Sequence, residues 1–209
     1  ADEGWSVLTP SLSLGVNRRV QSLPCEAIHT HSIEQDAAEL EAWVRWLFQH
    51  TGQAPVLIGH STGGAQVAAL LHYRPQIPAA QALLISLTYF GDAPDSPDAD
   101  RRLVEAQRAE RARPAAIDSF ALSFCRSYAT TPARLLSYLN WDAATLKSAL
   151  LALDRPVTVI IGGDDQRIDR SWLAALEAGG VQLRSIAGAD HFFDLAHEFE
   201  LADEVIQGL

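Results

Sequence analysis

The sequence of 209 residues contains a single lysine, Lys147, and carries a formal net charge of −10. Proteins that bind nucleic acid need clustered cations to neutralise phosphates, so this composition argues against a nucleic-acid partner. The arginine-rich stretch at 101–113 is interleaved with Glu105 and Glu110, a pattern typical of a solvated helix face. No apolar run approaches the roughly 18 residues that a spanning helix needs, so we expect no membrane span.

Methionine is absent and cysteine is scarce. The chain begins at Ala1 with no charged and apolar leader, so we expect a processed, trimmed or partial chain and a cytoplasmic location. Cys25 and Cys125 form neither a C-x-x-C pair nor a disulfide framework. We expect two free or buried thiols, and a single bridge between them stays open.

Metal-ligand patterns are also scarce. His29 and His31 form an H-x-H pair, but a metal site needs a third ligand that the sequence does not place. We therefore expect two solvated loop histidines, no metal and no organic cofactor.

What is present is an alternation of apolar strands and helices over a length that suits one core. The helix at 33–50 starts with a capping box, Ser32 and Gln35. Strands at 82–87 and 156–161 are continuously apolar, which indicates a parallel sheet covered on both faces. The pattern predicts an α/β fold. Further strands are expected at 5–9, 56–58 and 181–186, and further helices at 65–71, 170–178 and 195–207.

Residues 91–150 show no strand signal. Helical patterns occupy 99–112, 116–127 and 132–139, so we interpret 91–150 as a helical cap. It would separate an N-terminal part of the core, 1–90, from a C-terminal part, 151–209. Five aromatic residues of this region either line an apolar pocket or fasten the cap to the core: Phe120, Phe124, Tyr128, Tyr138 and Trp141.

The most informative stretch is residues 55–66. Three apolar residues run into Gly59-His60-Ser61-Thr62-Gly63, and a helix of small residues follows. A G-x-S-x-G pattern between a strand and a helix predicts a nucleophile elbow, in which a serine stands on a strained turn. The helix would direct its N-terminus at the reacting centre, where negative charge develops.

Ser61, one of Asp164 and Asp165, and His191 each follow the carboxyl end of a predicted strand. Ligands bind at that edge of an open α/β sheet, so we expect these side chains to meet. The order Ser, Asp, His and the turn Gly162–Ile168 resemble a serine-nucleophile, cap-bearing member of the α/β-hydrolase superfamily. The resemblance covers nearly the whole chain, from the elbow to the closing helix.

The resemblance implies a role for each residue. Ser61 would be the nucleophile, His191 the base and Asp165 the acid that orients it, with Asp164 as the alternative acid. The Thr62 N–H would give one oxyanion donor. The family usually has a further N-terminal strand and loop that gives a second donor. Here either an upstream segment of the same protein is missing, or the loop Pro10–Gly15 replaces it.

Three functions follow as hypotheses. The first is a serine hydrolase that cleaves a small-molecule ester or thioester through an acyl-serine. The second keeps the fold but acts on C–C bonds or as a lyase. The third is a binding or scaffold protein without turnover, because the oxyanion hole is incomplete.

Overall fold

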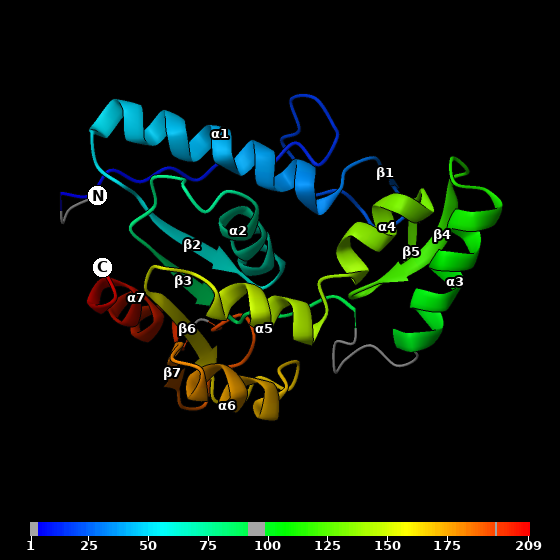
Figure 1. Ribbon diagram of the computed structural model, residues 1–209. Helices are drawn as coiled ribbons and strands as arrows, with labels where there is room; N and C mark the ends of the chain where they lie inside the picture. The colour runs from blue at the N-terminus through cyan, green and yellow to red at the C-terminus, as the bar shows by residue number, and fades with distance from the viewer. Residues whose placement is uncertain (1–3, 92–98, 195) are drawn as a thin grey trace.

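Four parallel strands form the main sheet, in the order β2–β3–β6–β7. The computed structural model describes residues 4–91, 99–194 and 196–209, and Figure 1 labels its elements. The strands are β2 (Val56–His60), β3 (Gln81–Ile85), β6 (Val157–Gly162) and β7 (Gln182–Ile186). All four run the same way, so their carboxyl ends share one edge of the sheet.

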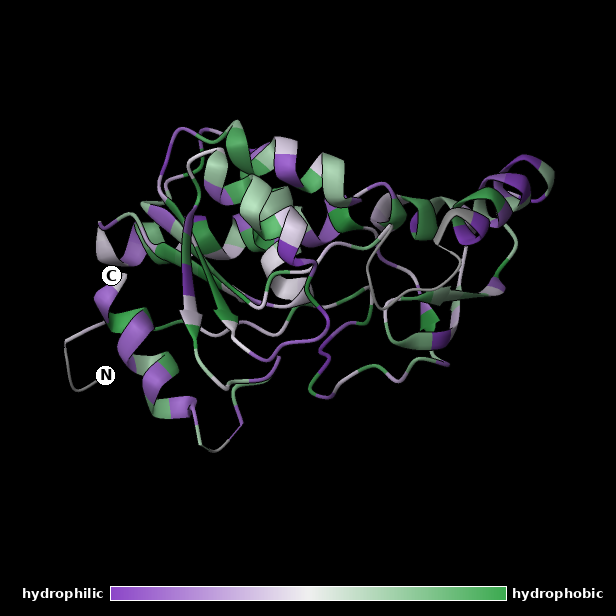
Figure 2. Cartoon of the chain, turned by 90° about the horizontal axis from the view of Figure 1, so that it is seen from below, coloured by the Kyte–Doolittle hydropathy of each residue, from purple (hydrophilic) through white to green (hydrophobic). Residues whose placement is uncertain are grey.

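Helices cover both faces of this sheet (Figures 1 and 2). Strand residues such as Leu57, Leu84 and Val159 pack against the helices of one face. Ile160 and Ile186 pack against α7 (Glu198–Gln207) on the other. The alternation follows from the two-residue period of a strand. The first face carries α2 (Thr62–Tyr73), α5 (Ala143–Leu151) and α6 (Arg170–Ala178). Helix α1 (Ile33–Thr51) packs on the outside of α2.

Helix α1 confirms the expected capping box. The Ser32 hydroxyl accepts from the Gln35 N–H, and the Gln35 side chain accepts from the Ser32 N–H. Gly52 ends the helix with a left-handed φ of 70°. Ile33 and Val44 are buried on the inner face, as the helical spacing predicts.

A second, three-stranded sheet lies beside the main one and corrects the prediction for residues 116–127. It contains β1 (Ile28–His29), β4 (Asp118–Leu122) and β5 (Cys125–Thr130), in the order β1–β5–β4. The expected helix is therefore wrong, as is the expectation of no strand in this region. Helices α3 (Ala99–Ala112) and α4 (Pro132–Leu139) match their predictions; residues 92–98 lie outside the described residues.

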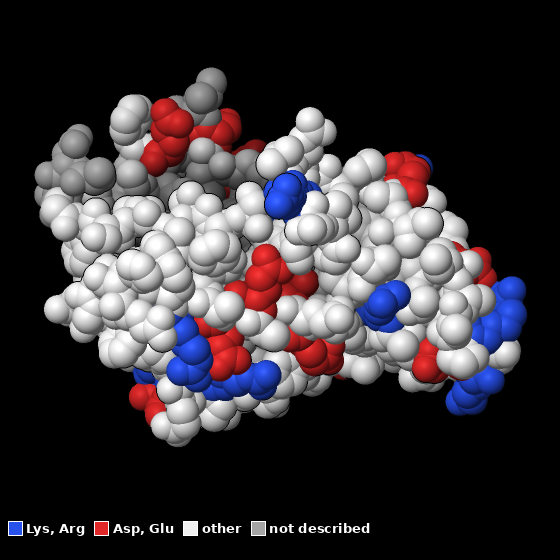
Figure 3. All heavy atoms as spheres, turned by 90° about the horizontal axis from the view of Figure 1, so that it is seen from above, with Lys and Arg blue, Asp and Glu red and all other residues white. Residues whose placement is uncertain are grey.

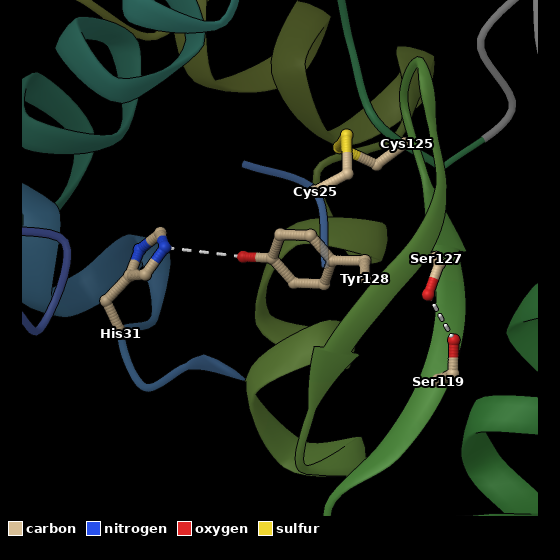
Figure 4. The surroundings of a disulfide bond; sticks show 6 residues. All are labelled: Cys25, His31, Ser119, Cys125, Ser127 and Tyr128. Atoms are coloured by element: carbon tan, nitrogen blue, oxygen red, sulfur yellow. Dashed lines mark hydrogen bonds between the residues drawn. A yellow bond between two sulfur atoms is a disulfide. The ribbon is translucent and has the colours of Figure 1, made fainter. Parts of the chain in front are cut away.

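The hairpin of β4 and β5 is stabilised by a tight turn, by a contact across its strands and by pairing with β1. Leu122 pairs with Cys125, so the turn has two central residues, and the first, Ser123, takes a φ of 51°. The hydroxyls of Ser119 and Ser127 pair across the strands at 2.9 Å (Figure 4). β1 then pairs with β5 from a distant part of the sequence.

The expected strand at 5–9 is also wrong, because the described residues before β1 contain no strand. Trp5 and Val7 are 50% and 72% exposed, so this segment has no apolar face buried against the sheet. In the main sheet, β2 is accordingly an edge strand.

Cys25 and Cys125 form a disulfide (Figure 4), so the preference for two free or buried thiols is wrong. The bond joins the loop before β1 to the first residue of β5, with 5.3 Å between the Cα atoms. A separation of 100 residues leaves no local sequence signal for such a pairing.

His29 and His31 are buried, which contradicts the expected solvated loop. Both the Tyr128 and the Tyr138 hydroxyls lie within hydrogen-bonding distance of His31, and Figure 4 shows the first contact. The carboxylate of Asp36 lies 3.1 Å from His31 Nδ1. This network fixes the loop before α1 against α4 and β5.

The outer surface mixes charges of both signs. Figure 3 shows acidic and basic side chains interspersed over the face seen from above. Within the described part of the chain, no helix is both long enough and apolar enough to span a membrane.

Candidate active site

The turn between β2 and α2 holds Ser61 in a strained conformation. Its φ of 54° and ψ of −122° are rarely adopted by a residue with a side chain. A hydrogen bond from the Ser61 N–H to the Ile85 carbonyl ties this turn to the end of β3. The serine hydroxyl therefore stands at the carboxyl edge of the sheet, at the N-terminus of α2.

Gly59 and Gly64 allow the strand and the helix on either side of this turn to pack closely. A Cβ on Gly59 would lie 2.6 Å from the Gly63 carbonyl oxygen, so no side chain fits there. A Cβ on Gly63 would meet nothing within 4 Å, whereas one on Gly64 would approach Leu87 Cδ1 to 2.9 Å. The strand and helix pass closely at positions 59 and 64.

A chain of hydrogen bonds connects Ser61, His191 and Asp165. The Ser61 Oγ lies 2.9 Å from His191 Nε2, and His191 Nδ1 lies 2.7 Å from Asp165 Oδ2. Asp165 and His191 are 3% and 4% exposed, so water competes little for these bonds. An imidazole held this way has one nitrogen fixed by a carboxylate and the other directed at a hydroxyl.

Asp164 and Asp165 have different surroundings. The second oxygen of the Asp165 carboxylate accepts from the Arg167 N–H at 2.9 Å, which fixes the carboxylate plane. Asp164 is exposed, and its N–H donates to the Ala189 carbonyl at 2.9 Å. The structure therefore places Asp165, and not Asp164, beside the imidazole.

Two side chains fix the loop that carries His191. The backbone carbonyl of His191 accepts hydrogen bonds from His60 Nε2 at 2.8 Å and from the buried Ser86 hydroxyl at 3.0 Å. A Cβ on Gly162 would lie 2.8 Å from the Ala189 carbonyl carbon, so only glycine lets the acid turn and the histidine loop pack together. His60, in the elbow, thus positions the histidine loop.

A cavity of about 420 Å³ opens over Ser61. Of the five cap aromatics that were candidates for a substrate pocket, Phe124 lines this cavity, and Phe120 lines a neighbouring one. Tyr128, Tyr138 and Trp141 are buried and fasten the cap region to the core instead. Trp141 Nε1, for example, donates to the Tyr73 hydroxyl at 3.2 Å.

The first turn of α2 lies at this cavity. Thr62 lines it, and N–H groups in the first turn of a helix have no partner within the helix. The loop Pro10–Gly15 lies elsewhere: Ser13 donates to Glu39 on α1 at 2.8 Å, and Gly15 packs on Thr30. None of its residues is among those that line the cavity over Ser61.

Sequence reasoning missed four polar or charged residues of the cavity wall: Thr88, Tyr89, Ser123 and Arg167. Thr88 and Tyr89 follow the carboxyl end of a predicted strand, a position that could have identified them. Ser123 was hidden because the hairpin was predicted as a helix. In the described residues, no group of three or more His, Cys, Asp or Glu side chains is arranged to hold a metal ion.

The arrangement can transfer protons between a serine hydroxyl and an imidazole. When the hydroxyl attacks a carbonyl carbon, the imidazole can take its proton, and the carboxylate stabilises the resulting cation. The N-terminus of α2 favours negative charge at the same place.

Comparison with known families gives one match over nearly the whole chain. A family model described as "Alpha/beta hydrolase family" matches residues 1–205. No curated protein matches the chain.

Solved structures share the fold at low identity. Monoacylglycerol lipase from Paleococcus ferrophilus superposes with a TM-score of 0.63 at 17% identity, over 85% of this chain and 74% of the lipase. Est1E from Butyrivibrio proteoclasticus gives 0.58 at 17% identity, over 85% and 69% of the two chains. The esterase domain of a Rhodothermus marinus protein gives 0.52 at 19% identity, over 84% and 67%.

Proposed function

We propose that this protein cleaves a carboxylic ester or thioester through an acyl-serine intermediate, because the chain belongs to the alpha/beta hydrolase family. The observation that carries this proposal is the hydrogen-bonded series Ser61–His191–Asp165, with distances of 2.9 and 2.7 Å. The α/β fold, with a parallel sheet flanked by helices, gives these three side chains their common edge.

The first half of the reaction acylates the enzyme. Ser61 Oγ attacks the carbonyl carbon while His191 Nε2 takes the hydroxyl proton, and the carbonyl oxygen becomes an oxyanion near the Thr62 N–H. The tetrahedral intermediate then collapses. The bond to the alcohol or thiol breaks, and the leaving group takes the proton from His191.

The second half returns the enzyme to its starting state. A water molecule gives a proton to His191 Nε2 as its oxygen attacks the acyl carbon. The bond to Ser61 Oγ breaks, the serine regains its proton, and the carboxylic acid leaves. Asp165 stays ionised and holds the imidazole tautomer throughout.

Labelling with a fluorophosphonate tests for the activated serine. We expect one adduct in the intact mass of the parent protein and none on Ser61→Ala. Ser148→Ala is the matched control, because Ser148 is an exposed residue of α5 that does not line the cavity over Ser61, and it should label like the parent. Labelling absent from the parent, or unchanged in Ser61→Ala, contradicts the proposal.

A panel of esters and thioesters then tests turnover. The neighbours suggest two members: a monoacylglycerol, because one neighbour is a monoacylglycerol lipase, and a ferulate ester, because Est1E has a structure with ferulic acid bound. Short activated acyl esters and their thioester counterparts complete the panel. Turnover that Ser61→Ala abolishes supports hydrolysis.

A binding protein without turnover is the second candidate. It is favoured by one observation: the loop Pro10–Gly15 contacts α1 and is not among the residues that line the cavity over Ser61. Loss of one donor typically costs about 10²–10³ in turnover. Binding of a panel ester to the parent protein, with neither labelling nor hydrolysis, would favour this candidate.

A further inference from the structure

The acid turn, residues 162–168, is fixed on one side by the backbone of its neighbours. The Gly163 N–H donates to the Ile186 carbonyl at 2.7 Å, and the Asp164 N–H donates to the Ala189 carbonyl at 2.9 Å. These bonds join N–H groups of the turn to the end of β7 and to the loop after it. The carbonyl groups at the start of the turn need partners of their own.

Arg170 supplies these partners from α6. Its Nη2 atom donates to the Gly163 carbonyl at 2.7 Å and to the Gly162 carbonyl at 3.1 Å. The same atom lies 3.4 Å from the Asp165 carbonyl. A guanidinium cation makes stronger hydrogen bonds than a neutral donor does. The charged group therefore connects the end of β6 with the residue that carries the carboxylate.

Helix α6 holds Arg170 at a defined place. The helix begins after Asp169, whose carboxylate accepts from the N–H groups of Ser171 and Trp172 at 2.8 and 3.2 Å. The Trp172 side chain is buried, and its ring N–H donates to the Ala143 carbonyl at 2.8 Å. Arg170 therefore belongs to a fixed first turn, and its planar guanidinium is a rigid donor.

The contacts of Asp165 act on two different parts of the residue. Its carboxylate binds the Arg167 N–H at 2.9 Å and His191 Nδ1 at 2.7 Å, so these two bonds set the orientation of the side chain. The side chain keeps this orientation only while the backbone of the turn stays in place, and the Arg170 contacts act on that backbone. A displacement of about 1 Å in a catalytic group can lower the rate about 10²-fold.

We propose that Arg170 is a positioning residue for the candidate active site: it fixes the backbone of the acid turn so that the Asp165 carboxylate holds His191 toward Ser61. This inference rests on the proposed function and adds a residue to the same site. Arg170 is not among the described residues that line the cavity over Ser61, so we expect it to affect kcat and not substrate binding.

Arg155 offers a matched control at the other end of the same strand. It lies just before β6, and its guanidinium donates to the carbonyls of Pro75, Ile77 and Ala79, between α2 and β3. Arg155→Gln therefore also removes a guanidinium that binds three carbonyls, but at the amino edge of the sheet, away from the candidate site. Arg170 is exposed, so we expect Arg170→Gln to fold.

Steady-state kinetics on an activated ester test the inference. Arg170→Gln should lower kcat about tenfold and leave KM within about twofold. Arg170→Lys keeps a cation with N–H donors and should stay within about threefold of the parent. Arg155→Gln, assayed well below its Tm, should retain the parent's kcat. A kcat for Arg170→Gln equal to that of Arg155→Gln, or a loss confined to KM, overturns the inference.

A second substitution shows whether Arg170 acts through Asp165. In the Asp165→Asn background, Arg170→Gln should change kcat by less than about twofold, because the contact that it positions is already altered. A further loss of about tenfold in this background would mean that Arg170 acts on another group, which contradicts the proposed role.

A measurement without substrate separates this inference from the proposed function. In protein with ¹⁵N-labelled histidine, the proton on His191 Nδ1 gives a low-field NMR signal when it is bonded to the buried carboxylate, and Asp165→Asn identifies this signal by its loss. We expect Arg170→Gln, and not Arg155→Gln, to shift the signal upfield or broaden it.

The outcomes are distinguishable. A signal unchanged in Arg170→Gln overturns the positioning role, even where the parent protein hydrolyses esters. A signal that responds to Arg170→Gln, in a parent protein that neither labels nor hydrolyses, supports the positioning role and overturns only the hydrolase.

Discussion

Asp164 and Asp165 follow β6, but the first is exposed and the second is buried, and this difference allows a matched test. Asp165→Asn keeps the shape of the side chain but replaces a carboxylate, which only accepts hydrogen bonds, with an amide that also donates them. The imidazole is then no longer held in the required tautomer, so we expect kcat to fall about 10³–10⁴-fold. Asp164→Asn changes an exposed turn residue and should stay within about twofold. Initial rates on an activated ester measure both, and a larger loss in Asp164→Asn would reverse the assignment.

We expect buried His29 to make the free energy of unfolding depend on pH. Its ring stacks on Tyr128 with centroids 3.9 Å apart, and burial lowers the pKa of His29 below the usual 6.5, with a further lowering from nearby His31. The unfolded chain therefore binds a proton at this histidine at higher pH than the folded chain does. The free energy of unfolding should fall as pH drops below about 6.5, until the folded pKa is reached.

The variant His29→Phe keeps an aromatic ring at this position but cannot titrate. Urea unfolding at about pH 7.5 and about pH 5.5 should show a smaller acid-induced loss for this variant than for the parent, by up to about 1.4 kcal/mol per pH unit of the window. Equal losses in both proteins would show that other groups cause the acid sensitivity.

The elbow depends on close packing between β2 and α2, so two glycines four residues apart should respond differently. Gly59→Ala places a Cβ 2.6 Å from a backbone oxygen, and we expect a loss of several kcal/mol or misfolding of the turn. Gly63→Ala meets nothing and lies within α2, so it should be neutral or stabilising by up to about 1 kcal/mol. Thermal unfolding of the two variants checks this, and equal Tm changes would contradict it.

The elements differ in how far sequence alone predicts them. Helices at 33–51, 99–112, 132–139 and 170–178 were found to within a residue, because caps, prolines and apolar spacing are local signals. Strands β3 and β6 of the main sheet were found because they are continuously apolar, whereas β7 mixes polar and apolar residues. The relative positions of Ser61, Asp165 and His191 followed from the rule that parallel strands share a carboxyl edge.

The hairpin β4–β5 could not be found this way. Its sequence lacks the Asn-Gly or Asp-Gly turn that marks a short hairpin, and its strand β5 pairs with β1 from about 100 residues earlier. Non-local pairing leaves no periodic signal in a single segment. The same reason hid the disulfide and the contacts of His31 with Tyr128 and Tyr138, which combine residues distant in the sequence.

The disulfide connects the N-terminal loop to the cap region and constrains a large part of the chain. Closing a loop of about 100 residues restricts the unfolded state, and loss of such a bond typically costs about 2–5 kcal/mol. We expect Cys25→Ser/Cys125→Ser to lose that much in urea unfolding. A reductant should lower the stability of the parent to the same level and leave the double variant unchanged; a parent insensitive to reductant would contradict the bond's role.

The disulfide also bears on where the protein functions. Such bonds persist in oxidising compartments and are rare in the reducing cytosol. The cytoplasmic location expected from the sequence stays a prediction, and the bond between Cys25 and Cys125 favours an oxidising environment instead.

One consequence of this bond concerns the covalent connectivity of the molecule. Residues 25–125 form a closed ring that includes Ser61, while Asp165 and His191 belong to the open tail that leaves the ring at Cys125. A single backbone cut anywhere inside the ring therefore releases no fragment. A nicked molecule would run as one species on a non-reducing denaturing gel and separate into two only after reduction. If the cut lies between Ser61 and Cys125, the bond alone keeps the serine covalently joined to its histidine.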